Sequence, residues 1–284
     1  MKNWFVLLLG AWATATIGIF LAVIAGDISE EQFRITGDGR QIIQATVMSV
    51  IIIPIILFLY RRLHKLTGKP NKPAYSFKRS HHFFTGFFLA TVLAVISLFT
   101  ASMIGWIDIN QWHAPQYWIS ALLINMLIAF FYEALPEELA LRGFVYDVLK
   151  HRFAVWLSIF AQSLVFVFFA FGHHILQVIV GMEPIEIILL SIPSYVLFFV
   201  FGIALALIRE WTGSLWAAVG FHLGYLVMAR FLIMPEEYGA PPIVSYQDTF
   251  MYLVGALFMI TGIMLGGILL FLLFLLIKRL LRSR

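Results

Sequence analysis

The sequence contains no cysteine among its 284 residues, which excludes disulfide bonds, thiolate metal ligands and a cysteine nucleophile. Charged residues are scarce too, at 12% of the chain, where an average soluble domain has about 25%. Hydrophobic residues make up 62%, and the mean hydropathy is +0.94. This composition excludes a soluble globular protein and leaves a membrane protein whose chemistry must use Glu, His, Ser, Tyr or a metal.

Uncharged runs long enough to cross a hydrocarbon core of about 30 Å predict the membrane spans. Six runs are uninterrupted, at residues 4–25, 42–60, 83–107, 153–172, 187–208 and 249–277. Two more apolar segments, 117–150 and 213–233, carry polar residues within them. We therefore predict an all-α polytopic membrane protein with about eight transmembrane helices, and we expect it to be integral to a bacterial plasma membrane.

The basic residues predict the orientation, because Lys and Arg are retained in short cytoplasmic loops. With eight spans, most of the 19 Lys and Arg residues fall on one side, in the loop 61–82, in the tail and in short connections. Most acidic residues outside the spans fall on the other side. Both termini are therefore expected to be cytoplasmic. We interpret the basic loop as a topological signal beside anionic lipid headgroups, and we expect no nucleic-acid partner.

Three segments follow from this organisation. Residues 1–110 hold the first three helices and the basic loop, residues 115–235 hold the polar spans, and residues 249–284 hold the last helix and a basic tail. The spacing Gly262-x-x-x-Gly266 in the last span is typical of ordinary close packing as well as of helix dimerisation. It therefore predicts no oligomeric state.

The most informative residues are Glu137, Glu138 and Arg142, which stand inside an apolar span. One charge at mid-bilayer costs about 2.5–3.5 kcal/mol, so such residues are retained mainly where they act. If the segment is helical, Glu138 and Arg142 lie four residues apart on one face and pair, whereas Glu137 points elsewhere. Glu137 is therefore the candidate general base. Pro136 directly before it predicts a kink or a new helix start.

Two other spans carry histidine, at His173-His174 and at His222. Two histidines and a carboxylate either bind a divalent ion that activates water, or activate water directly with Glu as the base. Both routes predict hydrolysis inside the bilayer. Alternatively, these polar groups form a buried ion-pair network between helices, or the proton or substrate relay of a transporter.

These residues resemble a known family. The matching motifs are Glu137-Glu138-x-x-x-Arg142-Gly143-Phe144, Phe169-x-x-x-His173, and Thr212-Gly213-Ser214-Leu215-Trp216 leading to His222. Their order and spacing are similar to those of the CPBP intramembrane proteases, which comprise the type II CAAX prenyl endopeptidases and the bacteriocin-processing and immunity proteins of the Abi group. The resemblance covers about residues 115–235.

The resemblance implies an endopeptidase in which Glu137 activates water, His173 positions it and His222 helps to stabilise the oxyanion. Glu138 and Arg142 would support this arrangement. The substrate would be a membrane-associated peptide or protein, either CAAX-like or a bacteriocin or pheromone precursor.

The sequence departs from the family at Leu226, where the last motif usually has Asn or Asp four residues after the histidine. A leucine side chain neither donates to an oxyanion nor binds a metal. Tyr225 substitutes only if the helix rotates by about 100°. The alternative is a catalytically silent member that acts as a scaffold or immunity factor.

The family is described in both metalloprotease and glutamate-type terms. Glu137, His173 and His222 form a three-ligand set with an open water position if a divalent metal such as zinc is used. We favour water activation without a tightly held metal.

Overall fold

The computed structural model describes residues 4–67, 76–251 and 253–282. Within them, eight helices are long and apolar enough to cross a membrane, which confirms the predicted all-α polytopic class. The protein is therefore an integral, multi-pass membrane protein. The continuous spans are α1 (Trp4–Phe33), α2 (Gly37–Thr67), α3 (His82–Met103), α7 (Val155–Ile179), α9 (Ile192–Thr212) and α11 (Val254–Arg282). The centre of the basic loop, residues 68–75, lies outside the described residues.

The fourth span, Pro115–Lys150, changes its hydrogen-bonding pattern along its length. It consists of α4 (Pro115–Ala129), a π-helical turn η2 (Phe130–Ala134), α5 (Leu135–Glu137), a second π-helical segment η3 (Glu138–Val145) and α6 (Tyr146–Lys150). Pro136 lies in the first turn of α5, where a missing N–H costs least. The predicted irregularity at Pro136 thus takes the form of two flanking π turns. Such turns often occur at functional sites.

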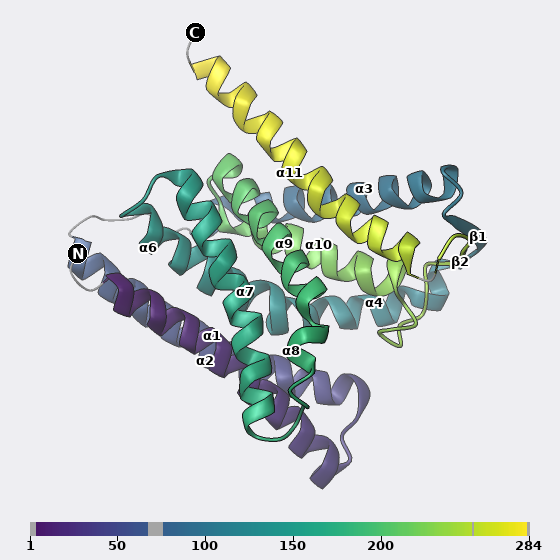
Figure 1. Ribbon diagram of the computed structural model, residues 1–284, viewed down its shortest axis with the longest axis horizontal. Coiled ribbons are helices and arrows are strands. Elements are labelled where there is room, and N and C mark those ends of the chain that lie inside the picture. The colour runs from purple at the N-terminus through teal and green to yellow at the C-terminus, as the bar shows by residue number, and fades with distance from the viewer. Residues whose placement is uncertain (1–3, 68–75, 252, 283–284) are drawn as a thin grey trace.

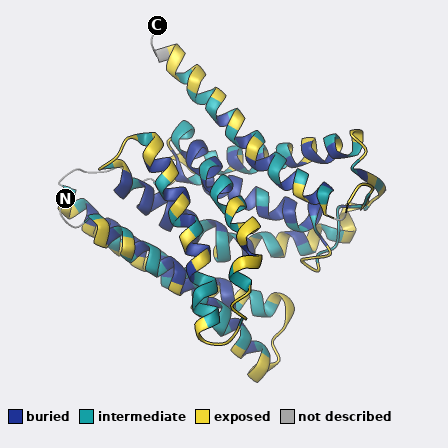
Figure 2. Cartoon of the chain, in the orientation of Figure 1, coloured by how far each residue is buried: buried dark blue, intermediate teal, exposed yellow. Residues whose placement is uncertain are grey.

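The seventh span lies at the centre of the bundle. It combines α10 (Leu215–Met228) with the π-helical turn η4 (Ala229–Ile233). In its apolar stretch 89% of the residues are buried, against 22–50% in the other spans. Figure 2 shows this concentration of buried residues around α10, while exposed residues are frequent on α11. The other helices therefore form a shell whose outward apolar side chains suit lipid.

Helices α3 and α10 approach closely through glycine. A Cβ atom on Gly220 of α10 would lie 1.9 Å from the carbonyl oxygen of Phe83, and one on Gly86 of α3 would lie 2.0 Å from that of Ala217. Larger residues do not fit at either position. Figure 1 shows α3, α4 and α10 running side by side, with α7 and α9 at a steep angle to them.

A two-stranded antiparallel ribbon, which the sequence did not predict, joins two distant loops. Strand β1 (Ile107–Trp112) pairs with β2 (Val244–Asp248), with Ile107 opposite Asp248 and Trp112 opposite Val244. The predicted spans 83–107 and 249–277 were therefore drawn too long at these ends: α3 stops at Met103, and α11 starts at Val254. A lone ribbon has unpaired edges, which lipid does not tolerate, so it marks a membrane surface.

The bundle has two faces, an inner and an outer one, which are defined by the loops they carry. The inner face carries Phe77–Arg79, residues 151–154, residues 213–214 and the C-terminal end of α11. The outer face carries residues 34–36, the β1–β2 ribbon, residues 180–191 with α8 (Ile187–Leu190), and residues 234–243. A cytoplasmic location of the inner face remains the prediction made from the Lys and Arg residues.

Candidate active site

A cavity of about 510 Å³ brings Glu137, His173 and His222 to one site from three different spans. The cavity is lined by residues of α1, the fourth span, α7, α9, the seventh span, the loop 234–243 and α11. They are Ile19, Tyr132, Glu133, Glu137, Phe169, Ala170, His173, His174, Ser194, Leu197, Phe198, Phe201, His222, Tyr225, Leu226, Arg230, Met234, Tyr238, Ile260 and Met264. The structure thus assembles the three side chains that the sequence singled out, and their catalytic roles remain predictions.

Glu137 is the last residue of α5, between the two π-helical segments. Its side chain is buried, with the residue 5% exposed, yet it lines the cavity. No ion pair or side-chain hydrogen bond joins it to another residue in the described part of the chain. A carboxylate in this setting is available to accept a proton from water.

Glu138 is fully buried. The predicted pair with Arg142 is present: Arg142 Nη1 donates to Glu138 Oε1 over 3.0 Å. The Arg142 guanidinium also lies over the ring of Phe166, 4.0 Å from its centroid. Because both charges are fully buried, their mutual contact is what offsets the loss of hydration.

A contact that sequence reasoning missed links Glu138 to His222. His222 Nδ1 lies 3.0 Å from Oε1 of Glu138, so one carboxylate oxygen serves both Arg142 and the imidazole. The edge of the Phe201 ring packs against the same imidazole, with centroids 5.1 Å apart. These contacts hold the orientation of His222. No sequence spacing indicates the contact between His222 and Glu138, because the two residues are 84 positions apart.

The two neighbouring histidines of α7 differ in their contacts. His174 Nδ1 lies 2.8 Å from the hydroxyl of Tyr195 on α9. The Nδ1 atom of His173 is buried and has no hydrogen-bond partner among the described residues. Both side chains line the cavity. Of these two histidines, His173 is the one whose Nδ1 atom has no hydrogen-bond partner in the described structure.

Tyr225 and Leu226 both line the cavity. On the sequence alone, Tyr225 replaces the missing polar group only if the helix rotates, and this role stays a prediction. The Tyr225 ring packs on Phe201 with centroids 4.5 Å apart, and no hydrogen bond to its hydroxyl occurs in the part of the chain described here. Leu226 places an apolar side chain where the family's polar residue is expected.

Glu133 and Arg230 also line the cavity, and neither was among the predicted site residues. They form an ion pair, and Arg230 Nη1 donates to Asn125 Oδ1 over 3.2 Å. The Arg230 guanidinium lies 5.4 Å from the centroid of the Tyr238 ring. Their one signal in the sequence was that each is a charged residue within an apolar span, and that the two charges are opposite.

The predicted metal ligands do not form a preassembled metal site. No three His, Asp or Glu side chains of the described ranges are grouped closely enough to hold a metal ion. The residues as placed therefore do not make a three-ligand metal site.

Comparison with known proteins confirms the resemblance in the segment that carries these residues. Residues 118–228 match the family model described as type II CAAX prenyl endopeptidase Rce1-like. The matched segment contains Glu137, His173 and His222 and spans less than half of the chain. No curated protein matches the sequence. The family match supports a membrane protease in general.

Proposed function

We propose that the protein is an intramembrane endopeptidase that hydrolyses a peptide bond in a membrane-associated peptide or protein. The observation that carries the proposal is the placement of Glu137, without a charged partner among the described residues, in one cavity with His173 and His222. The family match over residues 118–228 supports the same reaction class. An ion-pair network that served only to hold helices together would not leave a buried carboxylate unpaired beside a cavity.

In the proposed reaction, Glu137 accepts a proton from a water molecule whose oxygen attacks the carbonyl carbon of the scissile bond. The C–N bond then breaks, and the proton passes from Glu137 to the leaving nitrogen. His173 accepts or donates one hydrogen bond to hold the water. The reaction consumes one water molecule per bond and needs no other reactant.

His222 supplies the donor for the oxyanion. An imidazolium donates from both ring nitrogens, and Nδ1 of His222 lies 3.0 Å from Oε1 of Glu138. The Nε2–H group is then free to donate to the developing negative charge. The side chain of Tyr225 lines the same cavity. We propose it as the second donor, because Leu226 stands where the family has a polar Asn or Asp.

The test compares membrane peptides that accumulate in cells with the wild type and with Glu137→Gln, which keeps the size of the side chain and removes the base. We expect a precursor to accumulate and its cleavage by the purified variant to be lost. Glu186→Gln, outside the cavity, is the matched control and should cleave normally. Unchanged turnover by purified Glu137→Gln would defeat the proposal.

A second candidate is a catalytically silent protein that acts as a scaffold or immunity factor. Leu226 favours it, because this apolar side chain faces the cavity where a polar group is expected. In that case a Glu137→Ala, His173→Ala double variant retains the wild-type phenotype in cells. Under our proposal the double variant loses it.

A further inference from the structure

The cavity extends from the middle of the bundle toward the outer ends of several helices. Ser194 lies in the first turn of α9, His174 lies near the end of α7, and Met234 and Tyr238 belong to the outer loop 234–243. Tyr238 is 49% exposed at this position. The mouth of the cavity therefore lies on the outer face, and it carries polar groups.

The inner end of the cavity is closed by two layers of side chains. The first layer is Glu138, Arg142 and Phe166, all fully buried. It lies directly beneath His222, which contacts Glu138. A path from the inner face to Glu137 would have to disrupt a buried ion pair.

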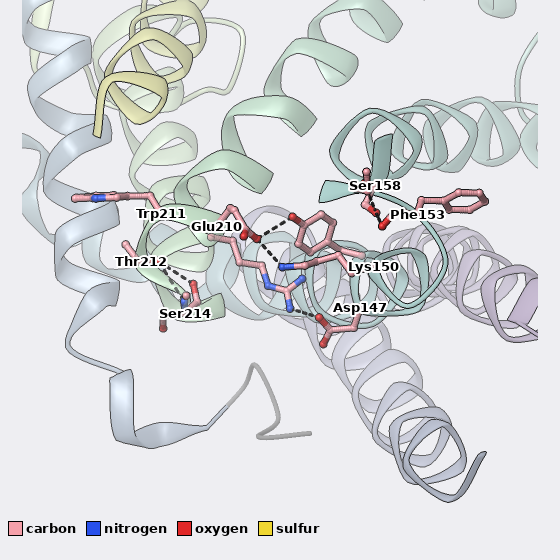
Figure 3. A network of polar contacts seen from close by, with 12 residues as sticks. Asp147, Lys150, Phe153, Ser158, Glu210, Trp211, Thr212 and Ser214 are labelled. Carbon is pink, nitrogen blue, oxygen red and sulfur yellow. Dashed lines mark hydrogen bonds and ion pairs between the residues drawn. The ribbon is translucent and has the colours of Figure 1, made fainter. Parts of the chain in front are cut away.

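The second layer lies nearer the inner face, where α6 meets α9. Arg209 Nη2 donates to Asp147 Oδ1 over 2.6 Å, and Lys150 Nζ lies 2.8 Å from Oε2 of Glu210. Figure 3 shows Asp147, Lys150 and Glu210 gathered in this network. The Tyr146 hydroxyl also donates to Glu210 over 2.9 Å. These contacts tie the two helices together at the inner end.

Grooves on the inner face do not reach the site. Three of them lie around Trp156, Phe77 and His82, and none is lined by Glu137, His173 or His222. The cavity that contains these three residues reaches the outer face at Tyr238.

We infer that the active-site cavity opens to the extracytoplasmic side of the membrane and that the substrate is a peptide segment presented there. The Lys and Arg residues place the inner face in the cytoplasm, so the mouth at Ser194 and Tyr238 faces outward. That the peptide is hydrolysed there rests on the proposed function, whereas the direction in which the cavity opens does not. A peptide terminus confined to the cytoplasm is not a substrate on this inference.

The absence of cysteine makes the direction of opening directly measurable, because every introduced thiol is unique in the chain. Leu226→Cys places a thiol inside the cavity without removing a proposed catalytic group. A charged thiol reagent that does not cross membranes should modify it when added outside intact cells. Leu223→Cys, on the same helix and 2% exposed, does not line the cavity and should stay unmodified.

Two further single-cysteine variants report the faces independently of the cavity. Ile185→Cys, 64% exposed on the outer face, should react in intact cells, whereas Phe77→Cys, 75% exposed on the inner face, should react only after permeabilisation. Modification of Leu226→Cys only after permeabilisation, or on neither side, would overturn the inference. The labelling needs no turnover, so loss of the proposed function leaves its result interpretable.

Discussion

Oε1 of Glu138 accepts hydrogen bonds from both Arg142 and His222, each over 3.0 Å, although the three residues come from two spans. One fully buried oxygen atom thereby couples the charge balance of the core to the orientation of the proposed oxyanion donor. Stability and activity should consequently respond to different parts of the same cluster, and variants can separate them.

Glu138→Gln should lower the free energy of unfolding by about 3–5 kcal/mol, because it leaves the Arg142 charge buried without a counter-ion. The double variant Glu138→Gln, Arg142→Met should recover much of that stability, since no charge is left unpaired. It should remain poorly active, because no carboxylate then orients His222 through Nδ1. Unfolding and turnover measured in detergent check both parts. Wild-type stability of Glu138→Gln would contradict the argument.

Leu226→Asn should raise kcat, because it adds an amide donor at a position that lines the cavity. A well-placed oxyanion donor contributes about 10²–10³ in kcat; we expect about tenfold, since the surrounding side chains are not arranged for an amide. The matched control is Leu223→Asn, which buries an amide away from the cavity and should only destabilise. A lower kcat in Leu226→Asn with unchanged stability would show that the position needs an apolar side chain.

Gly220→Ala should lower the free energy of unfolding by about 1–3 kcal/mol or more, as overpacking typically does. The reason is that its Cβ atom would meet the carbonyl oxygen of Phe83. The displacement of α10 should also reduce activity, since α10 carries His222. Gly10→Ala is the control, because a Cβ atom there would meet only a flexible methyl group of Leu59, at 4.0 Å. Thermal unfolding of the purified variants compares the two, and equal melting temperatures would refute the close approach.

The two inner-face ion pairs should differ in their energetic weight. The side chains of Arg209 and Asp147 are 8% and 20% exposed, whereas those of Lys150 and Glu210 are 36% and 25% exposed. Lys150→Gln should therefore change stability by only about 0–1 kcal/mol. Asp147→Asn should cost clearly more, because it strands the buried Arg209 charge. Chemical unfolding of both variants measures the two changes in stability. A smaller change for Asp147→Asn than for Lys150→Gln would contradict the ranking.

Purified protein should cleave its substrate without stoichiometric zinc, because the candidate ligands are not grouped into a metal site. Activity should persist after extensive chelation. Elemental analysis measures the metal content directly. One zinc per chain, lost together with activity on chelation and restored by zinc, would overturn this expectation.

Hydropathy was sufficient to predict the eight spans, because runs of about 20 apolar residues are a strong local signal. The ends of α3 and α11 were not predictable in this way, because the sequence near them is as apolar as a span and gives no sign that 107–112 pairs with 244–248. The ion pair between Glu138 and Arg142 followed from helical spacing alone.

The meeting of the three site residues required tertiary structure. In a picture of straight, parallel helices, His173 lies about 30 Å along its span while Glu137 and His222 lie near mid-membrane. The steep angle between α7 and α10 removes that difficulty (Figure 1). The contact between His222 and Glu138, and the pairing of Arg230 with Glu133, likewise depend on how spans pack.

The β1–β2 ribbon has a consequence for how such a protein diversifies. It anchors the loop that carries Met234 and Tyr238, since Ile243 donates from its backbone to Phe231 and the Tyr246 hydroxyl donates to the Ile233 carbonyl. Insertions or substitutions in this ribbon would change the rim of the cavity and leave Glu137, His173 and His222 unchanged. Selectivity and chemistry are thus carried by separable parts of the chain, and selection can alter the former without risk to the latter.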